Sequence, residues 1–318
     1  MEKKRILAAV DGSPWSHLVV QYVIRMVDPG MLEIVLFHVS SPIPESFWDL
    51  EKSPAFRGRL APVAAWEAAQ KQAVEDFMEA ATASLRQAGV PDESVRVVVR
   101  RREVGISRDL ALEAHQGYDA VVVGRRGVSD VKDLILGSVA TKLLGRVVEV
   151  PLWIVGEAGS PDGVVVALDA SDAALQAVNF TASLVGPKPR RVLLVHVLRG
   201  MGPESREILK SFSPEAQRDW RKQTEAEMER AVARMDAVFE RASTILEAEG
   251  LPRHLIETKV ITGATSRAVA IVQAARLGGY ETVVVGRRGL SRVEEFFMGR
   301  VSNKVVQLAR DRTVWVVS

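Results

Sequence analysis

The sequence predicts an α/β fold made of two similar domains, and two observations carry this prediction. Short apolar runs rich in Val, Ile and Leu alternate with longer segments in which apolar residues recur every three or four positions. Strands that alternate with helices imply parallel pairing, right-handed crossovers and helices on both faces of the sheet. The whole order of strands and helices then occurs a second time within the 318 residues, and each copy is long enough to bury its own core.

The first half contains five apolar runs that we expect to be strands. They are residues 5–10, 32–40, 95–99, 120–123 and 151–155. Pro14 is expected to open the first helix, at a position where its missing N–H costs nothing. Three further helices are expected at residues 66–87, 107–115 and 137–146. Residues 41–62 contain four prolines and no clear period, so we expect a long loop there.

The second half repeats this order after a short polar segment. Residues 157–163 are small, polar and rich in helix breakers, and we interpret them as a linker between a domain at 1–156 and a domain at 164–318. Trp66 and Trp220 begin the long helices on their apolar sides and are expected to be packing residues. The matching elements of the second half are expected to be strands at residues 164–168, 192–198 and 314–317, a loop at 199–213, and a long helix at 220–246.

Three pairs of residues, each 158 positions apart, set the correspondence between the halves. They are Asp11 and Asp169, His38 and His196, and Gly105 and Gly263. Later glycines of the two halves lie 162 positions apart, so we expect the four extra residues of the second half around 277–280. The two histidines end buried strands, where a hydrogen-bonded structural role is expected.

The composition is that of a soluble globular protein, with 47% hydrophobic and 26% charged residues. The formal net charge of +2 is too small to argue for a nucleic acid or an anionic membrane as partner. No apolar run approaches the roughly 20 residues of a membrane span, and the charged start MEKKR leads into a strand rather than a signal peptide. Because the chain has no cysteine, disulfides and thiolate zinc sites are excluded, and the cytoplasm is the expected location.

A glycine-bearing motif follows the fourth strand of each half. Residues 121–139 read VVVGRRGVSDVKDLILGSV, and residues 283–301 read VVVGRRGLSRVEEFFMGRV with the same glycine spacing. A strand that ends in glycine, a glycine-bearing loop and a helix start present backbone N–H groups to a phosphate. The glycines let the backbone approach phosphate oxygens without a Cβ in the way. The alternative is that these residues are turn glycines and a helix cap.

Together these motifs resemble those of tandem universal stress proteins, in which two repeats of the universal stress protein A family share one chain. The matching pieces are a first strand ending in Asp-Gly-Ser, a second strand ending in His-Val, and a Gly-x2-Gly-x9-Gly-Ser signature. The resemblance covers both halves. It implies Rossmann-like (adenine nucleotide alpha hydrolase-like) domains, each a five-stranded parallel sheet ordered 3-2-1-4-5 with helices on both faces.

The resemblance also implies the partners of the chain. Members with the full glycine signature commonly bind ATP, and Mg²⁺ would be held mostly by the phosphates. Family domains pair in dimers through their last strands, so the two last strands of this chain are expected to pair with each other. Association of two chains into a homodimer is left open, and neither a nucleic acid nor a membrane is an expected partner.

Site residues follow from the resemblance, which places the Asp beside adenine and ribose, the Val backbone at the adenine edge, and the glycines at the phosphates. The candidates in the first half are Asp11, Val39, Gly124, Gly127, Gly137, Ser138 and Val139. Those in the second half are Asp169, Val197, Gly286, Gly289, Gly299, Arg300, Val301 and Ser302. For Asp11 and Asp169 the alternative is a helix N-cap formed with the following serine.

The second half departs from the family pattern at one position. Arg300 stands where the family has Ser or Thr, so the small hydroxyl donor is missing there. Ser302 carries a hydroxyl two positions further on, where the first half has Ala140. The arginine pairs at 125–126 and 287–288 are expected either to approach a triphosphate or to be solvated charges of the loop.

We therefore expect an ATP-binding regulatory protein of the stress-response type rather than a fast catalyst. The sequence contains no P-loop and no Rossmann GxGxxG after the first strand, and the motif regions show no nucleophile–base pair. No catalytic or metal-ligating residue is predicted. The alternatives are a slow ATPase or nucleotidyl-transfer enzyme on the same fold, and a dimerisation scaffold that binds no nucleotide.

Overall fold

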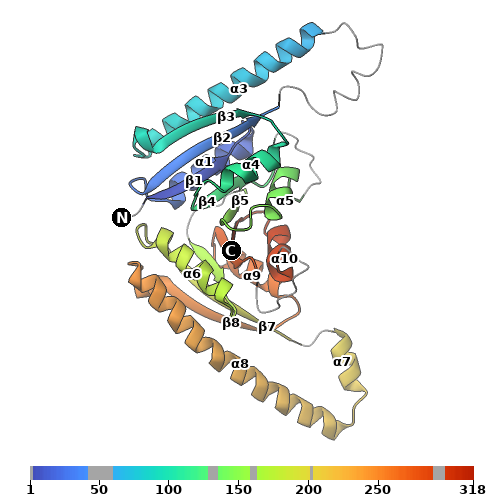
Figure 1. Ribbon diagram of the computed structural model, residues 1–318. Helices are drawn as coiled ribbons and strands as arrows, with labels where there is room; N and C mark the ends of the chain where they lie inside the picture. The colour runs from blue at the N-terminus through green and yellow to red at the C-terminus, as the bar shows by residue number, and fades with distance from the viewer. Residues whose placement is uncertain (1–2, 42–59, 128–134, 158–162, 201–202, 289–297) are drawn as a thin grey trace. The chain divides into compact units, whose positions relative to one another are not determined.

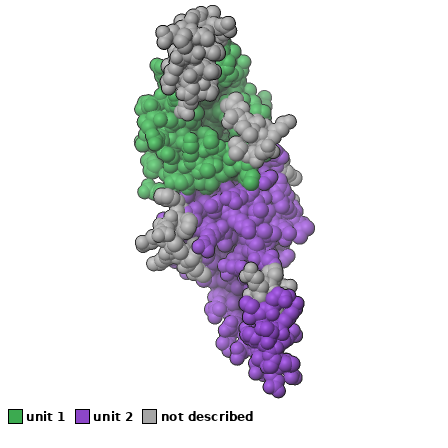
Figure 2. Space-filling model, turned by 90° about the vertical axis from the view of Figure 1, so that its right-hand side faces the viewer, with its two compact units in different colours: residues 1–155 green, residues 156–318 purple. Residues whose placement is uncertain are grey.

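The computed structural model describes residues 3–41, 60–127, 135–157, 163–200, 203–288 and 298–318. The chain divides into two compact units, Met1–Val155 and Gly156–Ser318, which Figure 2 shows in different colours. Each unit is an α/β domain with its own buried apolar core. Within the described ranges, no helix is long and apolar enough to cross a membrane.

Unit 1 alternates strands and helices as predicted (Figure 1). Its elements are β1 (Lys4–Ala9), α1 (Pro14–Met26), β2 (Leu32–Ser40), α3 (Leu60–Gln87), the 3-10 turn η2 (Asp92–Ser94), β3 (Val95–Arg101), α4 (Ile106–Ala114), β4 (Ala120–Gly124), α5 (Ser138–Leu144) and β5 (Leu152–Val155). The α1 helix begins at Pro14 as expected, and every predicted strand of this half is present.

The sheet of unit 1 has the strand order β3-β2-β1-β4-β5, and all neighbouring strands run parallel. This is the order 3-2-1-4-5 that the family resemblance implies. The chain runs outward from β1 to β3 and then returns to β4 on the other side of β1. The carboxyl ends of β1 and β4 therefore flank the point where the strand order reverses, which is where open α/β sheets bind ligands.

Unit 2 repeats this architecture. Its elements are β6 (Val164–Ala167), α6 (Asp172–Val185), β7 (Val192–Arg199), α7 (Pro203–Lys210), α8 (Pro214–Ala248), the 3-10 turn η3 (Arg253–Leu255), β8 (Ile256–Ala264), α9 (Arg267–Leu277), β9 (Thr282–Gly286), α10 (Arg300–Leu308) and β10 (Thr313–Val317). The strand order within the unit is β8-β7-β6-β9-β10, again parallel throughout.

Strand registers correct the expected correspondence between the halves. Ile34 pairs with Val95 in unit 1, and Val192 pairs with Ile256 in unit 2. Val192 lies 158 positions after Ile34, but Ile256 lies 161 positions after Val95. Three of the four extra residues therefore fall in the connection between β7 and β8, not around 277–280. That connection holds the long helix, whose ends lie outside the sheet and tolerate insertions.

The same register overturns the pairing of two glycines. Gly105 precedes α4 as its N-cap, and the N-cap of α9 is Ser266, 161 positions later. Gly263 instead lies inside β8 with a φ of +73°. The pairing of Val197 with Ile261 and of Arg199 with Ala264 shifts the register at this point, so Gly263 belongs to a bulge of the strand.

The long helix α3 is longer than the strands that it covers. Its 28 residues span about 42 Å at 1.5 Å per residue. The nine residues of β2 span only about 30 Å. Figure 1 shows α3 extending beyond the sheet. Trp66 lies in the first part of α3 and is 39% exposed, so its interpretation as a packing residue is wrong, whereas Phe77 and Leu85 further along are buried.

A helix replaces part of the loop predicted at residues 199–213. The eight residues of α7 form two turns, too few for an apolar period to be recognised in the sequence. Ser213 then caps α8, because its hydroxyl oxygen accepts a hydrogen bond from the N–H of Ala216 at 3.2 Å. Most of the loop predicted at 41–62 lies outside the described residues, and α3 begins at Leu60 within that range.

The last strand of each unit carries a fully buried tryptophan. Trp153 of β5 meets Tyr22 of α1 edge to face, with ring centroids 5.9 Å apart. Trp315 of β10 meets Phe180 of α6 in the same way at 5.6 Å. In both units the first helix therefore packs an aromatic ring against the last strand, an arrangement that adds to the burial of apolar area. The pairing of the two last strands with each other stays a prediction.

Candidate functional site

The glycine loop of unit 1 joins the end of β4 to the start of α5. Gly124 is the last residue of β4, and Gly137 is the N-cap of α5. The N–H of Gly137 donates to the carbonyl oxygen of Arg125 at 2.8 Å. This bond brings the start of α5 to the carboxyl end of β4, although the two bonded residues lie twelve positions apart in the sequence. Residues 128–134 of the loop lie outside the described ranges.

Asp11, which follows β1, is held in place by its neighbours. Its Oδ1 accepts hydrogen bonds from the N–H of Ser13 at 3.0 Å and from the hydroxyl of Ser16 at 2.8 Å. The N–H of Asp11 donates in turn to the Ser16 hydroxyl oxygen at 2.8 Å. Ser13 is the N-cap of α1, but its side chain makes no capping bond. Asp11 therefore fixes the turn before α1 through Oδ1, and its second oxygen, Oδ2, takes no part in these bonds.

Asp11 and Gly127 lie against each other. A Cβ placed on Gly127 would collide with Oδ2 of Asp11. The strands that carry these two residues, β1 and β4, are neighbours in the sheet. Two candidates that lie far apart in the sequence are thus brought together at the edge where the strand order reverses. They can approach each other this closely only because residue 127 has no side chain.

Gly124 and Gly137 are required by packing within the protein. A Cβ on Gly124 would lie 2.8 Å from the Cβ of Trp15, so this glycine lets α1 pack closely on β4. A Cβ on Gly137 would lie 3.2 Å from the carbonyl oxygen of Arg125. The guanidinium of Arg126 lies over the Trp15 ring, 5.7 Å from its centroid. The sequence interpretation missed Trp15, which its position in the first turn of α1 could have indicated.

The remaining candidates of unit 1 differ in exposure. Ser138, the first residue of α5, is exposed, and Val139 is half-buried. Val39 is buried near the carboxyl end of β2 and pairs with Arg100 of β3. These positions leave the Ser138 hydroxyl accessible to a ligand.

His38 and His196 have the structural role that was predicted for them. Nδ1 of His38 is hydrogen-bonded to the carbonyl oxygen of Val10 at 2.9 Å. Nδ1 of His196 makes the equivalent bond to Leu168 at 2.7 Å. Each histidine ties the second strand of its unit to the residue just before the candidate aspartate, so it supports the site without facing it.

Asp169 of unit 2 is held differently from Asp11. Its Oδ1 accepts from the N–H of Ser171 at 3.1 Å and also from the hydroxyl of the same serine. The Ser171 hydroxyl oxygen accepts from the N–H of Ala174 at 3.3 Å, as an N-cap. Ala174 occupies the position that Ser16 has in unit 1, 158 residues earlier. Without a serine at that position, the capping serine itself contacts the aspartate.

The described part of the glycine loop of unit 2 has the same backbone hydrogen bond as unit 1 but different side chains. The N–H of Gly299 donates to the carbonyl oxygen of Arg287 at 2.8 Å, as in unit 1. Arg300, the first residue of α10, is exposed, and Val301 is half-buried. The buried hydroxyl of Ser302 donates to the carbonyl oxygen of Gly286 at 2.6 Å. This hydroxyl therefore bonds inward and does not replace the missing one. Gly289 lies outside the described residues.

The first arginine of each loop pair is buried rather than solvated. Arg125 is 1% exposed and Arg287 is 4% exposed. Nε of Arg287 donates to the Ser318 hydroxyl oxygen at 3.0 Å. Burial, with the neighbouring Arg288, lowers the pKa of Arg287 to about 10. The first arginine of each pair is therefore not a solvated charge of the loop, whereas the approach of one arginine of each pair to a triphosphate stays a prediction.

Both halves of the chain match a known protein family. The sequence matches the universal stress protein family over residues 3–156 and 162–318. The chain belongs to the universal stress protein family. A comparison with curated proteins found no match.

Solved structures of similar fold match this chain over nearly its whole length. A universal stress protein from Archaeoglobus fulgidus DSM 4304 is 18% identical, with a TM-score of 0.63 over 99% of this chain and 98% of that one. A functionally unknown protein from Pseudomonas aeruginosa PAO1 is 13% identical, with a TM-score of 0.57 over 99% and 92% of the two chains. A putative universal stress protein from Pseudomonas aeruginosa UCBPP-PA14 is 14% identical, with a TM-score of 0.56 over the same shares. At these identities the likeness concerns the fold.

Proposed function

We propose that unit 1 binds ATP and that the protein acts as a nucleotide-dependent regulator. The observation that supports this most is the contact between Asp11 and Gly127 at the point where the strand order reverses. A carboxylate suited to a ribose hydroxyl lies directly beside the loop, and the glycine leaves room for that carboxylate. The family membership of the chain supports the same assignment.

Each candidate residue of unit 1 has a proposed role in that site. Asp11 accepts hydrogen bonds from the ribose, and the backbone of Val39 contacts the adenine edge. Gly127 and Gly137 let the backbone approach the phosphates, and Ser138, with Val139 beside it, supplies the hydroxyl and backbone N–H groups that face them. Mg²⁺ would be held by the phosphates themselves and would shield their charge.

Unit 2 is proposed to bind ATP more weakly than unit 1. Arg300 replaces Ser138, and the Ser302 hydroxyl is bonded to Gly286 inside the protein. The first change removes a hydroxyl donor from the region that faces the phosphates, and the inward bond of Ser302 keeps its hydroxyl from replacing that donor. One ATP per chain is therefore the expected stoichiometry.

Regulation is proposed in preference to catalysis because of how Asp11 is held. The Ser16 hydroxyl that contacts Asp11 is buried, and both of its hydrogen bonds go to Asp11. Such a pair fixes a binding residue and does not present a nucleophile to a bound nucleotide. Any hydrolysis of ATP is expected to be slow, and rapid phosphate release by the purified protein would contradict the regulatory role.

Native mass spectrometry and calorimetry of the purified chain test this proposal. The wild-type protein should bind one ATP. Gly127→Ala should weaken binding at least tenfold, because the new methyl group displaces the Asp11 carboxylate. Gly145→Ala is the matched control, since a Cβ there makes only an ordinary contact of 3.8 Å with Lys142. Absence of ATP binding by the wild-type protein, or equal binding by the two variants, would refute the site.

A further inference from the structure

The two units differ at the carboxyl end of the second strand, where Val39 and Val197 lie. In unit 2, the guanidinium of Arg267 reaches this point and its Nε donates to the carbonyl oxygen of Val197 at 3.2 Å. Arg267 is the first residue of α9, seventy positions along the chain from Val197. A carbonyl at the edge proposed for adenine is thus already bonded to a donor of the protein itself.

Unit 1 has no such donor at the equivalent position. The N-caps Gly105 and Ser266 correspond, so the residue that matches Arg267 is Ile106, the first residue of α4. Ile106 is 37% exposed, and its apolar side chain offers no hydrogen-bond donor to Val39. The two positions therefore match in the fold, but unit 1 has an aliphatic side chain there and unit 2 has a guanidinium.

Arg267 can reach Val197 because the start of α9 lies at the carboxyl ends of β7 and β8. Gly263 adopts a φ of +73°, and the pairing of β7 with β8 shifts after Val197. The N–H of Gly200 then donates to the carbonyl oxygen of Ala264 at 3.1 Å, which keeps the end of β7 against the end of β8. The start of α9 follows three residues after Ala264 and so lies beside the end of β7.

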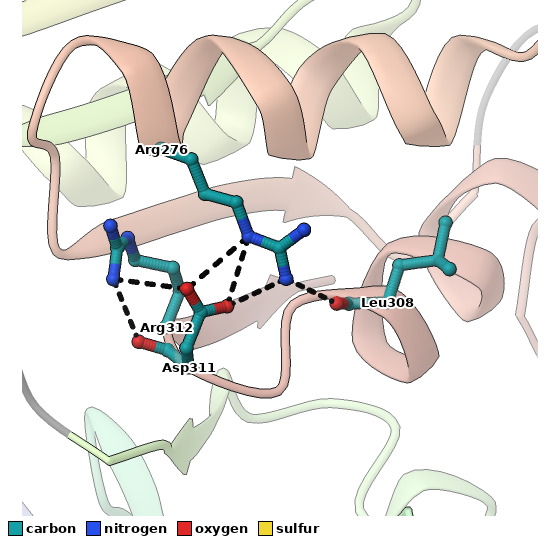
Figure 3. Close-up of polar contacts among 4 residues, drawn as sticks. All are labelled: Arg276, Leu308, Asp311 and Arg312. Atoms are coloured by element: carbon teal, nitrogen blue, oxygen red, sulfur yellow. Dashed lines mark hydrogen bonds and ion pairs between the residues drawn. The ribbon is translucent and has the colours of Figure 1, made fainter.

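The far end of α9 is anchored to α10, which carries the phosphate-facing region of unit 2. Figure 3 shows Arg276 of α9 against Asp311, with Nη2 2.8 Å from the carboxylate, and the same nitrogen donates to the carbonyl oxygen of Leu308 at 3.1 Å. These bonds tie the C-terminal end of α9 to α10 and to the turn that follows it.

We propose that Arg267 closes the adenine edge of unit 2 and thereby restricts ATP to unit 1. The exocyclic amine of adenine donates a hydrogen bond to a backbone carbonyl, and the Nε–H of Arg267 donates to that same carbonyl. An incoming adenine must therefore displace the Arg267 guanidinium, which already makes a charge-assisted hydrogen bond to this carbonyl. This inference rests on the proposed function, because it takes Val39 and Val197 as the adenine edges of the two units.

Calorimetric ATP stoichiometry in variants of the full chain tests the proposal. Arg300→Ser first restores the family hydroxyl in unit 2. With Arg267 still present, this variant should remain at one ATP per chain. Adding Arg267→Ile should raise the stoichiometry to two. Adding Arg253→Ala instead is the matched control, because it removes the same charge at the opposite end of β8, and it should leave one ATP per chain.

The reciprocal change tests the same idea in unit 1. Ile106→Arg should place a guanidinium at the adenine edge and weaken ATP binding at least tenfold, with thermal unfolding measured as a check of folding. The inference is refuted if Arg300→Ser alone binds two ATP, if the Arg267→Ile double variant still binds one, or if Ile106→Arg binds as tightly as the wild type. Two equal sites in the wild type would refute this inference and the weaker binding proposed for unit 2 but would leave the ATP site of unit 1 standing, whereas no ATP binding by the wild type would refute that site as well.

Discussion

At the scale of single residues, the three glycines of the unit 1 loop have different physical roles. Gly124 is required because Trp15 of α1 packs against its Cα. Gly127 leaves room beside the Asp11 carboxylate, and Gly137 lets the start of α5 approach the backbone of Arg125. The glycine signature therefore serves both the packing of the protein, at Gly124, and the proposed ligand site, at Gly127. Substitutions at single glycines can separate these two roles.

Gly124→Ala should destabilise unit 1. Its methyl group would lie within 2.8 Å of the Trp15 Cβ, so α1 would have to move away from β4. Overpacking of this kind costs about 1–3 kcal/mol. Urea unfolding measures the loss, and Gly145→Ala again serves as the control. An unchanged unfolding midpoint would mean that α1 does not pack against β4 as described.

Ser16→Ala should weaken ATP binding through Asp11. The substitution removes the hydroxyl that bonds both the N–H and Oδ1 of Asp11, so the carboxylate is held less firmly. Loss of a buried hydrogen bond costs about 1 kcal/mol, and a comparable loss in ATP affinity, about fivefold, is expected by calorimetry. Ser171→Ala removes the corresponding contact from unit 2 and should leave the affinity unchanged. Equal affinities in both variants would count against Ser16 as a positioning residue.

At the scale of elements, the ion pair between α9 and the turn after α10 is expected to depend on pH. Asp311 lies against Arg276 and Arg312 (Figure 3). Burial would raise the pKa of Asp311, but the hydrogen bond from Arg276 and the nearby positive charges lower it below the ordinary value of 3.8. A carboxylate whose pKa is lowered on folding stabilises the folded state above the unfolded-state pKa. This stabilisation is lost as the pH falls through the folded-state pKa.

Asp311→Asn should therefore reduce the stability of unit 2 at neutral pH and change it little in strong acid. The Asp311 side chain is 41% exposed, so solvent screening limits the expected loss to about 0.5–1 kcal/mol. Thermal unfolding of the variant and the wild type between pH 7 and pH 3 measures the difference. A difference that grows as the pH falls would show that Arg276 does not stabilise the charged form of Asp311.

At the scale of the whole molecule, the two units share a fold and differ in their sites. Unit 1 combines the Asp11–Ser16 pair, Ser138 and Ile106, whereas unit 2 has Ala174, Arg300 and Arg267 at the matching positions. Repetition of the fold therefore does not imply two equal binding sites. We expect one unit to bind ATP and the other to respond only indirectly.

Hydrogen exchange of the full chain should show this difference. Saturating ATP should slow amide exchange in residues 10–16 and 124–141 and leave the matching segments of unit 2 nearly unchanged. At an ATP concentration of 100 times Kd, a ligand that binds only the folded state stabilises it by about 2.7 kcal/mol. Equal protection of both sets of segments by ATP would contradict the assignment of a single site.

Much of the fold was predictable because it depends on local patterns. Apolar runs located the strands, the opening Pro14 located α1, and the repeated glycine motif marked the ends of β4 and β9. The exposed Trp66 was not predictable from these patterns, because an apolar position is buried only where the sheet extends beneath it. Nor was α7, since two turns show too little periodicity.

The sequence by itself determined the two-domain repeat, the strands and the family signature, because helical and strand periods and short motifs are properties of neighbouring residues. The tertiary structure alone decided which distant residues meet. It placed Gly127 beside Asp11, Trp15 beside Gly124, and Arg267 on the carbonyl of Val197. Such contacts depend on strand order and register, which join residues that lie far apart in the sequence and so are not properties of neighbouring residues.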